Sequence, residues 1–467
     1  MEFNPFQRKF RKGEKRVALV YSNRYAGGVA NIGLQQIYAE INEFAICERF
    51  YADVFDGLRS VETGTPLSEF DFALFSIQYE NDCFKAVEIL RKSNFKGIKI
   101  AGGPCVMENP RPLRRFFDAF FIGEVEGKLG EILSVKEAVE LSGIEGIWTG
   151  REDRVKRVFS KIGKHLEKEI IAEGAYGRCF LIELGRGCVR KCSFCLVRQI
   201  YAPPRWRRVE DLPEVRDVGK VALIAPSPTD HPRFKEILQS FVERGLEVSP
   251  SSLRADALNE ELVELLKAGN VKSITLAPET SSEKLSEILR KEISFEDLRE
   301  AVEICAGKFE KLKLYYMVGI PGESIEDVRG IVEQAKELKS LIPRVEISVN
   351  PLVPKPHTPM QWFGFDKLED LQKKINLLRV ECVKAGIEFS QPNLREFVLQ
   401  TIIARGDERA GDIFDGKSYR DFKYLLNPLD PEIELPWDFI DHHYKRDRLL
   451  REFEEIKSGL ESRKESG

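Results

Sequence analysis

The sequence predicts an α/β protein with two parallel-sheet domains, and two observations carry this prediction. Short apolar runs alternate with helical patterns from residue 17 to residue 123, and the alternation restarts at residue 180 and continues to residue 349. Strands that are apolar along their whole length are buried on both faces, as in a parallel sheet covered by helices. At 467 residues the chain is also too long for one ordinary hydrophobic core.

The first alternation predicts a Rossmann-like domain over residues 16–135, behind a basic tail of residues 1–15. A glycine-rich loop at residues 25–31 follows the first strand, and helices are expected from Ile32 and over residues 83–91. The strands are expected in four apolar runs, namely residues 17–22, 70–78, 97–101 and 118–123.

Glycines stand where the last two of these strands end. Gly102 and Gly103 open one such loop, which continues to Cys105, and Gly123 opens the other. Open parallel sheets hold ligands in the crevice outside the carboxyl ends of their strands. We therefore expect Gly102, Gly103, Cys105 and Gly123 to face a bound ligand.

The second alternation predicts a partial (β/α)6 barrel of the TIM type over residues 178–388, open relative to an eight-stranded barrel. The polar stretch at 136–177 is a connector, with a small hairpin expected around residues 148–151. Residues 389–467 predict a small, mostly helical C-terminal region that ends in an exposed, frayed helix. The barrel strands are expected at residues 180–184, 221–225, 246–249, 271–277, 312–318 and 344–349.

The composition says more about where the protein is located in the cell than about what it does. Charged residues make up 32% of the chain but nearly balance, so the formal net charge of −4 argues neither for nor against nucleic acid. No apolar run approaches the roughly 20 residues that cross a bilayer. The basic N-terminus lacks the apolar stretch of a signal peptide. We expect a cytoplasmic protein that has no membrane partner and keeps its thiols reduced.

Three of the nine cysteines stand together just beyond the first barrel strand, at Cys188, Cys192 and Cys195. Thiolates this close in one loop can each bind one iron of a cubane cluster. A redox-only cluster usually takes four cysteines, so three leave one iron open to an exchangeable group. Zinc is the alternative, but it takes a fourth protein ligand, and the nearest other thiol, Cys179, precedes the strand. The pattern therefore predicts a [4Fe–4S] cluster on these three metal ligands.

From about residue 178 to 365 the chain resembles the radical S-adenosylmethionine (SAM) superfamily. More narrowly, it resembles the branch that contains methylthiotransferases and proteins with an N-terminal cobalamin-binding-type domain. The resemblance implies that the open iron chelates SAM and that electron transfer into the sulfonium releases a 5′-deoxyadenosyl radical. It also implies an external electron donor of the flavodoxin or ferredoxin type. Besides the cysteines, four segments that end barrel strands carry it, namely residues 251–256, 277–280, 318–323 and 350–359.

The resemblance assigns SAM contacts to five residues. Phe194 could pack against the adenine, although it could equally shield the cluster from water. Arg254 would suit the carboxylate of the methionine moiety, and Glu279 the ribose hydroxyls or the amino group. Gly319 and Gly322 would turn their backbone toward the adenine. All except Phe194 stand at strand carboxyl ends, the side on which such barrels do chemistry.

The end of the second barrel strand departs from the superfamily pattern. It reads Ala225-Pro-Ser-Pro-Thr-Asp230, without the Gly-Gly-Glu that many members use to hold the amino group of SAM. That contact would fall to backbone carbonyls, to Ser227 or to Thr229.

The N-terminal domain resembles the cobalamin-binding type through its strand-end loops. No histidine lies in the first 150 residues, so this domain could not supply a lower histidine ligand to cobalt. Gly102, Gly103, Cys105 and Gly123 would face the corrin. For Cys105 both a ligand role and an inert buried thiol are open, and the inert thiol is favoured. The domain could also keep this fold without the cofactor.

Three functions are open at this point. The first is cobalamin-dependent methylation of an unactivated carbon by a SAM-derived radical. The second is methylthiolation, or another radical modification of tRNA or protein, without cobalamin. Methylthiotransferases carry a second cluster on N-terminal cysteines, the first just after strand one, where this chain has residues 22–24, Ser-Asn-Arg. The third, a non-catalytic Fe–S redox protein, is disfavoured by the open iron and the strand-end motifs.

Basic residues surround the cysteine loop. They could neutralise the phosphates of an RNA substrate. They could instead stabilise thiolates and balance the acidic run at residues 210–214, which is the favoured interpretation. The residues are Arg186, Arg190, Lys191, Arg198, Arg205, Arg207 and Arg208.

Overall fold

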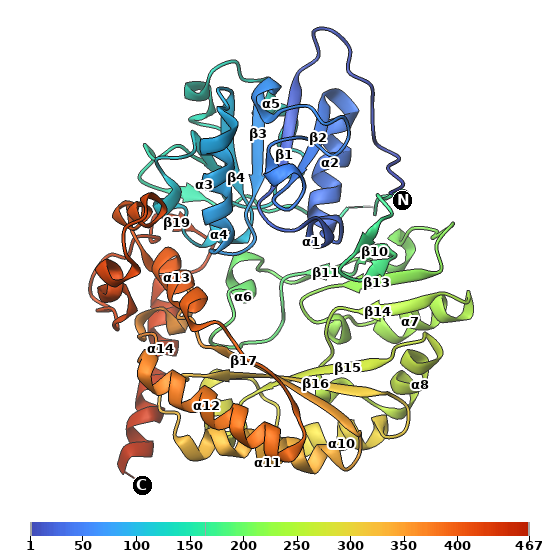
Figure 1. The fold of residues 1–467 in the computed structure, drawn as a ribbon, viewed down its shortest axis with the longest axis vertical. Helices are drawn as coiled ribbons and strands as arrows, with labels where there is room; N and C mark the ends of the chain where they lie inside the picture. The colour runs from blue at the N-terminus through green and yellow to red at the C-terminus, as the bar shows by residue number, and fades with distance from the viewer. Residues whose placement is uncertain (1, 164, 466–467) are drawn as a thin grey trace.

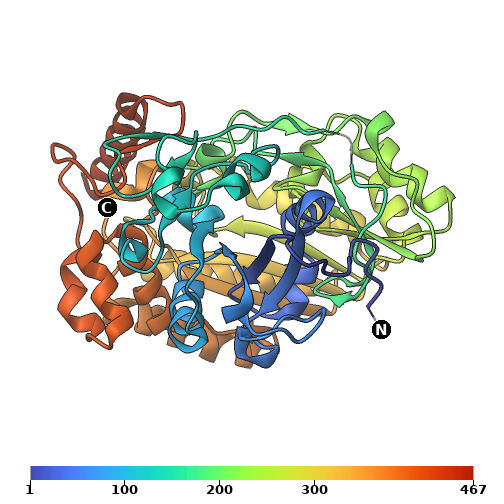
Figure 2. The same ribbon diagram turned by 90° about the horizontal axis from the view of Figure 1, so that it is seen from above.

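The computed structural model describes residues 2–163 and 165–465. Met1 of the expected tail, Lys164 of the connector and the last two residues of the C-terminal region lie outside the described residues. An N-terminal α/β unit stands above an open, curved array of strands, and the C-terminal segment runs down one side (Figure 1). Seen from above, the N-terminal unit overlies the strands of this array (Figure 2).

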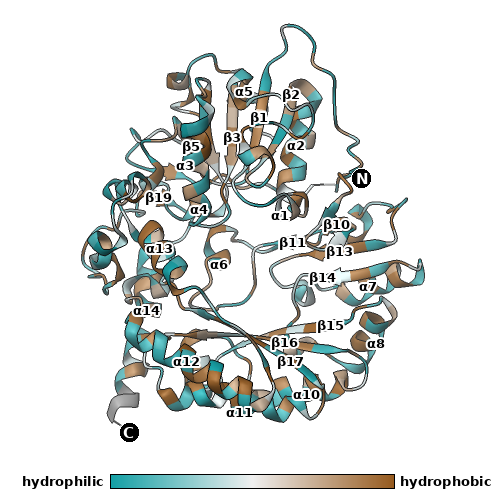
Figure 3. Ribbon diagram, viewed as in Figure 1, coloured by the Kyte–Doolittle hydropathy of each residue, from teal (hydrophilic) through white to brown (hydrophobic). Residues whose placement is uncertain are grey.

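The N-terminal unit is built on a six-stranded sheet of order β2-β1-β3-β4-β5-β6. The first five strands are parallel, and β6 pairs antiparallel with β5. The strands are apolar, as Figure 3 shows for β1 and β3, and they lie between helices that carry both polar and apolar residues. The strands are β1 (Arg16–Tyr21), β2 (Ile46–Tyr51), β3 (Phe72–Ser76), β4 (Ile98–Gly102), β5 (Ala119–Phe121) and β6 (Ile147–Trp148); the helices are α1 (Tyr25–Val29), α2 (Ile32–Phe44), α3 (Asp82–Ser93), α4 (Pro104–Glu108) and α5 (Leu129–Ser134).

Two local features of this unit differ from the sequence prediction. Strand β2 was not expected, because Glu48 and Arg49 interrupt its apolar pattern. Both side chains are buried all the same, since Arg49 Nε donates to Glu62 at 2.6 Å and Thr63 donates to Glu48 at 2.6 Å. The glycine-rich loop is in fact the short helix α1.

The second unit confirms the six predicted barrel strands and adds a seventh, β18. All neighbours are parallel, but the hydrogen bonding divides between β14 and β15 into a three-stranded and a four-stranded sheet. Helices α10, α11 and α12 cover the outer side of β15–β17 (Figure 1). The strands are β10 (Phe180–Glu183), β13 (Lys220–Ile224), β14 (Glu247–Pro250), β15 (Ser273–Glu279), β16 (Lys311–Val318), β17 (Arg344–Pro351) and β18 (Glu388–Ser390); the helices are α7 (Phe234–Glu243), α8 (Glu260–Ala268), α9 (Glu283–Leu289), α10 (Phe295–Cys305), α11 (Ile325–Lys339) and α12 (Leu368–Ala385).

The prediction of a hairpin around residues 148–151 is wrong. Strand β6 completes the N-terminal sheet, and β7 (Val155–Lys156) pairs instead with β19 (Ile440–Asp441) of the C-terminal region. The reason is burial, because the Trp148 ring packs 4.5 Å from the ring of Phe439. The connector does contain a hairpin, formed by β8 (Glu173–Gly174) and β9 (Gly177–Arg178).

The C-terminal region is mostly helical, as expected. It contains α13 (Leu394–Arg405), two 3-10 segments (Glu408–Asp415 and Tyr419–Leu426) and α14 (Arg446–Glu465). The expectation of an exposed last helix is wrong for the first part of α14, where Leu449, Phe453 and Ile456 are buried. No described helix is both long and apolar enough to span a bilayer.

Candidate active site

The three clustered cysteines lie on one loop between β11 (Gly185–Arg186) and α6 (Val197–Ile200). The loop begins at Gly187, whose φ of +74° favours glycine. A Cβ there would also lie 2.5 Å from the Tyr201 carbonyl oxygen. Cys192 is buried, and Cys188 and Cys195 are half-buried. The chain thus closes tightly just before the first cysteine and presents all three thiols from one segment.

The chemistry of this donor set fits an iron–sulfur cluster. Burial raises the pKa of all three thiols, that of Cys195 to about 11, and the charge of Cys188 raises the pKa of the other two. The thiols therefore lie within one another's electrostatic field, where bound iron would stabilise the thiolates. In the described part of the chain no three His, Cys, Asp or Glu side chains could hold a single metal ion. A cubane instead binds each thiolate on a separate iron.

Buried hydrogen bonds hold this loop against the barrel. The Ser193 backbone N–H donates to the Leu289 carbonyl at 2.9 Å, and its hydroxyl donates to the Ile288 carbonyl at 2.9 Å. Arg190 pairs with Asp230 at 2.5 Å after strand β13. The position of the thiols is therefore set by two barrel segments.

Two of the predicted SAM residues lie near the cysteines. Arg254 and Glu279 both act through their charge on the pKa of Cys192, Arg254 lowering it and Glu279 raising it. The Arg254 guanidinium is paired with Asp256 through two hydrogen bonds of 2.8 and 2.9 Å. Glu279 has a φ of +71°, and its carboxylate lies 2.9 Å from the Lys291 ammonium.

The other three predicted SAM residues face apolar neighbours. Phe194, like Leu460, packs against an apolar cluster that includes Met317 and Met360. Gly319 and Gly322 both have a φ of +77°. A Cβ at Gly319 would meet Leu371 of α12, and a Cβ at Gly322 would meet Leu460 of α14. A contact of their backbone, or of Phe194, with the adenine stays a prediction.

The end of β13 carries the hydroxyls that were expected to replace the missing Gly-Gly-Glu. Thr229 Oγ1 is buried and has no hydrogen-bond partner among the described residues. An unpaired buried hydroxyl costs about 1–3 kcal/mol, so a ligand that pairs with it gains affinity. Within the described part of the chain the Ser227 hydroxyl is buried and unpaired as well, and a contact of either hydroxyl with SAM stays a prediction.

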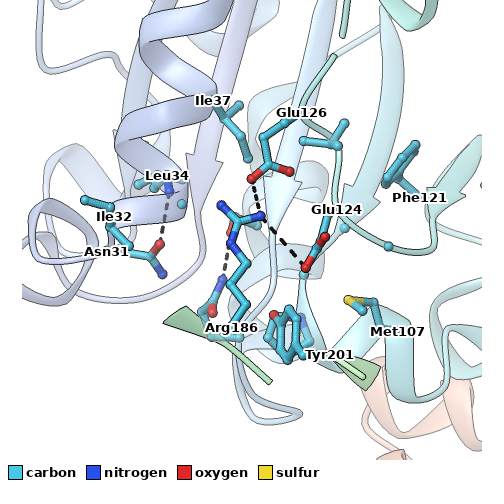
Figure 4. Close-up of a pocket in the computed structure, with 18 of the residues that line it drawn as sticks. Asn31, Ile32, Leu34, Ile37, Met107, Phe121, Glu124, Glu126, Arg186 and Tyr201 are labelled. Atoms are coloured by element: carbon cyan, nitrogen blue, oxygen red, sulfur yellow. Dashed lines mark hydrogen bonds and ion pairs between the residues drawn. The ribbon is translucent and has the colours of Figure 1, made fainter. Parts of the chain in front are cut away.

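A cavity of about 390 Å³ lies between the carboxyl edge of the N-terminal sheet and the cysteine loop. Its walls come from the ends of β3, β4 and β5, from α2, and from the segment that precedes Cys188 (Figure 4). Gly102, Gly103 and Gly123 line it. Cys105 does not, because its Sγ lies 3.7 Å from that of Cys83 in the core. The expectation that Cys105 faces the ligand is therefore wrong, and the buried thiol that was favoured for it is confirmed.

Arg186 joins the two units across this cavity. Its guanidinium lies 2.6 Å from Glu126 and 3.8 Å from Glu124, which both follow β5 (Figure 4). It also lies 2.6 Å from Glu183. Arg205 pairs with Glu124 as well, at 2.7 Å. The polar part of the cavity is thus a network of paired charges.

The basic residues around the loop are mostly neutralised by carboxylates. Arg208 pairs with Asp211 of the acidic run at 210–214, and the other pairs use carboxylates elsewhere in the chain, so the choice between charge balance and RNA binding stays a prediction. The pairs are Arg186–Glu183, Arg190–Asp230, Arg198–Glu452, Arg205–Glu124, Arg207–Glu183 and Arg208–Asp211.

The loop after β17 fixes helix α4, one wall of the cavity. The Lys355 ammonium contacts Glu80 and lies 3.2 Å from Glu108, and both carboxylates are buried. His357 Nε2 lies 2.9 Å from the Glu108 carbonyl, and His442 Nε2 lies 2.8 Å from that of Met107. Removing one partner of a buried ion pair strongly destabilises a protein, because the other charge is left buried and unpaired. The contact of Lys355 with Glu80 and Glu108 therefore holds the two units in one arrangement.

Sequence reasoning missed several of these residues. Asp256 stands two residues after Arg254, so the sequence could have indicated that these two side chains pair. Lys291 and Asp230 reach the site only through loop geometry, for which the sequence carries no periodic signal. Lys355 lies in the predicted segment 350–359, but nothing in the sequence indicates its partners.

Comparisons with known proteins support the predicted family. A family model described as "Radical SAM superfamily" matches residues 182–335, and one described as "Radical SAM proteins, N-terminal" matches residues 33–159. An uncharacterised protein of Methanocaldococcus jannaschii is 39% identical over 455 residues, covering 94% of this chain and 96% of the relative. The ribosomal protein uS12 methylthiotransferase RimO of Petrotoga mobilis is 22% identical over 349 residues, covering 71% and 75%.

Two solved structures share the fold. TsrM of Kitasatospora setae, a radical SAM methyltransferase with cobalamin and a [4Fe–4S] cluster bound, has a TM-score of 0.58 at 16% identity, covering 75% of this chain and 74% of that chain. The cobalamin-dependent radical enzyme OxsB, with aqua-cobalamin and SAM bound, has a TM-score of 0.51 at 14% identity, covering 96% and 62%. With the 39%-identical relative and the matching models, these findings show that the chain belongs to the radical SAM superfamily, whose enzymes use a [4Fe–4S] cluster and SAM.

Proposed function

We propose that this protein is a cobalamin-dependent radical SAM methylase that acts on an unactivated carbon. The observation that carries the proposal is the cavity between the N-terminal sheet and the cysteine loop. TsrM and OxsB, which resemble the chain in fold, are described with cobalamin bound. A cofactor in this cavity would lie beside the loop that holds the cluster.

The walls of the cavity fit a corrin. Most of the lining is apolar, as a large macrocycle requires. At Gly102 a Cβ would meet no atom closer than 3.8 Å, so the missing side chain leaves room in the cavity. Among the described residues that line the cavity, none is His or Cys, so the cobalt would have no imidazole or thiolate ligand from these walls. Bound cobalamin would carry a methyl group between SAM and the substrate.

The chain's own residues would divide the work at the cluster. Cys188, Cys192 and Cys195 would hold three irons and leave the fourth for SAM. Arg254 and Glu279 would orient SAM, and Thr229 would take up one of its polar groups. The apolar walls of the cavity would keep water from the radical. The substrate would lie between the barrel and the N-terminal unit.

Methylthiolation is the second candidate, because the RimO of Petrotoga mobilis matches 71% of this chain. That reaction needs a second cluster on N-terminal cysteines. Here Cys47 lies on β2, and the Cys83–Cys105 pair lies in the core at the starts of α3 and α4. These positions favour the cobalamin proposal.

The proposal is tested without knowledge of the substrate by supplying cobalamin to the reconstituted protein. The protein is incubated anaerobically with SAM and a low-potential reductant, with and without hydroxocobalamin, and S-adenosylhomocysteine is measured. We expect S-adenosylhomocysteine only with cobalamin, because transfer of the methyl group to a reduced corrin releases it. Cleavage of SAM to 5′-deoxyadenosine alone, unchanged by cobalamin, would contradict the methylase proposal and leave the radical chemistry intact.

A further inference from the structure

The inner face of the barrel is polar where its strands divide into two sheets. Ile274 and Leu276 of β15 are buried in the core beneath the helices, whereas Thr275 between them is half-buried on the opposite face. Strand β16 shows the same alternation, and its half-buried positions include Lys313 and Tyr315. Bulky apolar side chains normally fill the interior of such a barrel. These polar positions form no such core, so the inner face is open to a ligand.

A second cavity, of about 490 Å³, lies along this inner face. It has no lining residue in common with the cavity beside the cysteine loop. Its wall follows the chain through β14 from Glu247 to Ser251, a path of about 13 Å at the rise of a strand. It ends at Leu253, the residue before Arg254. A long ligand could therefore extend from the amino ends of the strands to the predicted SAM site.

The charged side chains of the second cavity are mostly cationic. Its described wall contains three lysines and one glutamate, namely Lys220, Lys272, Lys313 and Glu247. Lys313 has a carboxylate partner, because its ammonium lies 3.2 Å from Glu346. The Glu247 carboxylate accepts a hydrogen bond from Asn270 at 2.6 Å. More positive than negative charge therefore faces the cavity.

Lys220 is the cation of this wall that is best placed to bind an anion. Unlike the exposed Lys272, it is half-buried, and among the described residues it has no carboxylate partner. Its ammonium donates to the Tyr176 carbonyl at 2.8 Å, so two of its three N–H groups remain for a ligand. Ser249 and Thr275 line the same cavity, and within the described chain their hydroxyls have no partner either. Burial disfavours an unpaired charge, so a bound anion would stabilise this arrangement.

We propose that the second cavity binds an anionic group of the substrate, a carboxylate or a phosphate, and that Lys220 is its main contact. The rest of the substrate extends along β14, so that its reacting carbon lies near Arg254, about 13 Å from the anionic group. Binding at a distance from the reacting carbon orients that carbon toward the radical. The proposal rests on the proposed function for the reaction alone, because binding of the anion needs neither cobalamin nor SAM.

The test measures the binding of two small anions to the full chain with its reconstituted cluster. Inorganic phosphate and glutarate are titrated separately by anaerobic isothermal titration calorimetry at constant ionic strength. We expect saturable binding of at least one of them. Lys220→Met should weaken that binding about 10-fold, the effect of losing one charge-assisted hydrogen bond. Binding of phosphate alone supports a phosphorylated substrate, and binding of glutarate alone supports a carboxylate substrate.

Control variants separate a contact with the anion from a general effect of charge or folding. Lys284→Met removes the same charge on the exposed side of α9 and should bind both anions as the wild type does. Lys220→Arg keeps the charge and should bind the anion within about 3-fold of the wild type. Ser249→Asp adds a negative charge to the wall and should weaken anion binding as well. This variant keeps the test decisive if Lys220→Met loses its iron and does not fold.

Three results would overturn the proposal. The first is wild-type affinity for both anions in Lys220→Met and in Ser249→Asp, and the second is no binding of either anion by the wild type. The third is binding of an RNA oligonucleotide that depends on Lys220, without binding of either small anion, which would assign the cavity to nucleic acid. None of these results depends on cobalt, so failure of this proposal and failure of the methylase proposal are distinguishable.

Discussion

Replacing Cys192 with Ala is expected to abolish the iron–sulfur cluster and with it all cleavage of SAM. Cys192 is the buried member of the three thiols, and its neighbour Ser193 is fixed to the barrel by two hydrogen bonds. Two remaining thiols cannot hold a cubane that needs three protein ligands to expose one iron. Iron content, the visible absorption of the cluster and the yield of 5′-deoxyadenosine should all fall to background.

Cys179→Ala is the matched control for this variant. Cys179 is a buried thiol just before β10 and is the cysteine nearest to the cluster in the sequence. A radical SAM cluster does not use it, so the variant should keep its iron. A four-cysteine zinc site would use it, so loss of metal in Cys179→Ala would contradict the three-ligand assignment. Wild-type SAM cleavage by Cys192→Ala would contradict it as well.

Replacing Gly102 with Val is expected to remove cobalamin binding while the iron content stays unchanged. Gly102 ends β4 at the wall of the cavity, and a side chain there would extend into space where Phe121, 3.8 Å away, is its nearest neighbour. Gly102 is not among the glycines with a positive φ, so valine introduces no backbone strain. We expect the affinity for hydroxocobalamin to fall by at least about 100-fold, because two methyl groups would overlap a rigid macrocycle.

Gly130→Val is the control for the change of residue type. Gly130 lies on the exposed side of α5 and has no atom within 4 Å of its built Cβ. This variant should bind cobalamin as the wild type does. If Gly102→Val also binds cobalamin with wild-type affinity, the cavity is not the corrin site and the methylase proposal loses its structural support.

Much of the fold could be predicted because burial leaves a periodic signal. The barrel strands β16 and β17 are recognisable, since apolar residues recur at every second position and amphipathic helices separate the strands. Strand β2 could not be recognised, because Glu48 and Arg49 are polar in the sequence and become acceptable in the core only through distant partners. The pairing of β7 with β19 could not be predicted either, since the two strands lie far apart in the chain.

The same distinction, between residues close in sequence and residues that only the fold brings together, applies to the candidate site. The cluster cysteines are close in sequence, so their spacing alone predicts the metal centre. Lys291 and Lys355 meet Glu279 and Glu80 only because loops of unusual conformation bring distant segments together. The sequence left both a ligand-facing and a buried Cys105 open for a different reason. On the short helix α4 a rotation of one residue decides whether a side chain faces the cavity or the core.

The most direct test of the central claim is the metal content of the protein after anaerobic purification with added hydroxocobalamin. The account predicts about four irons and about one cobalt per chain, with the visible spectrum of a bound corrin beside that of the cluster. About four irons without cobalt would contradict the methylase proposal, leaving a radical SAM enzyme whose N-terminal unit serves as a substrate platform.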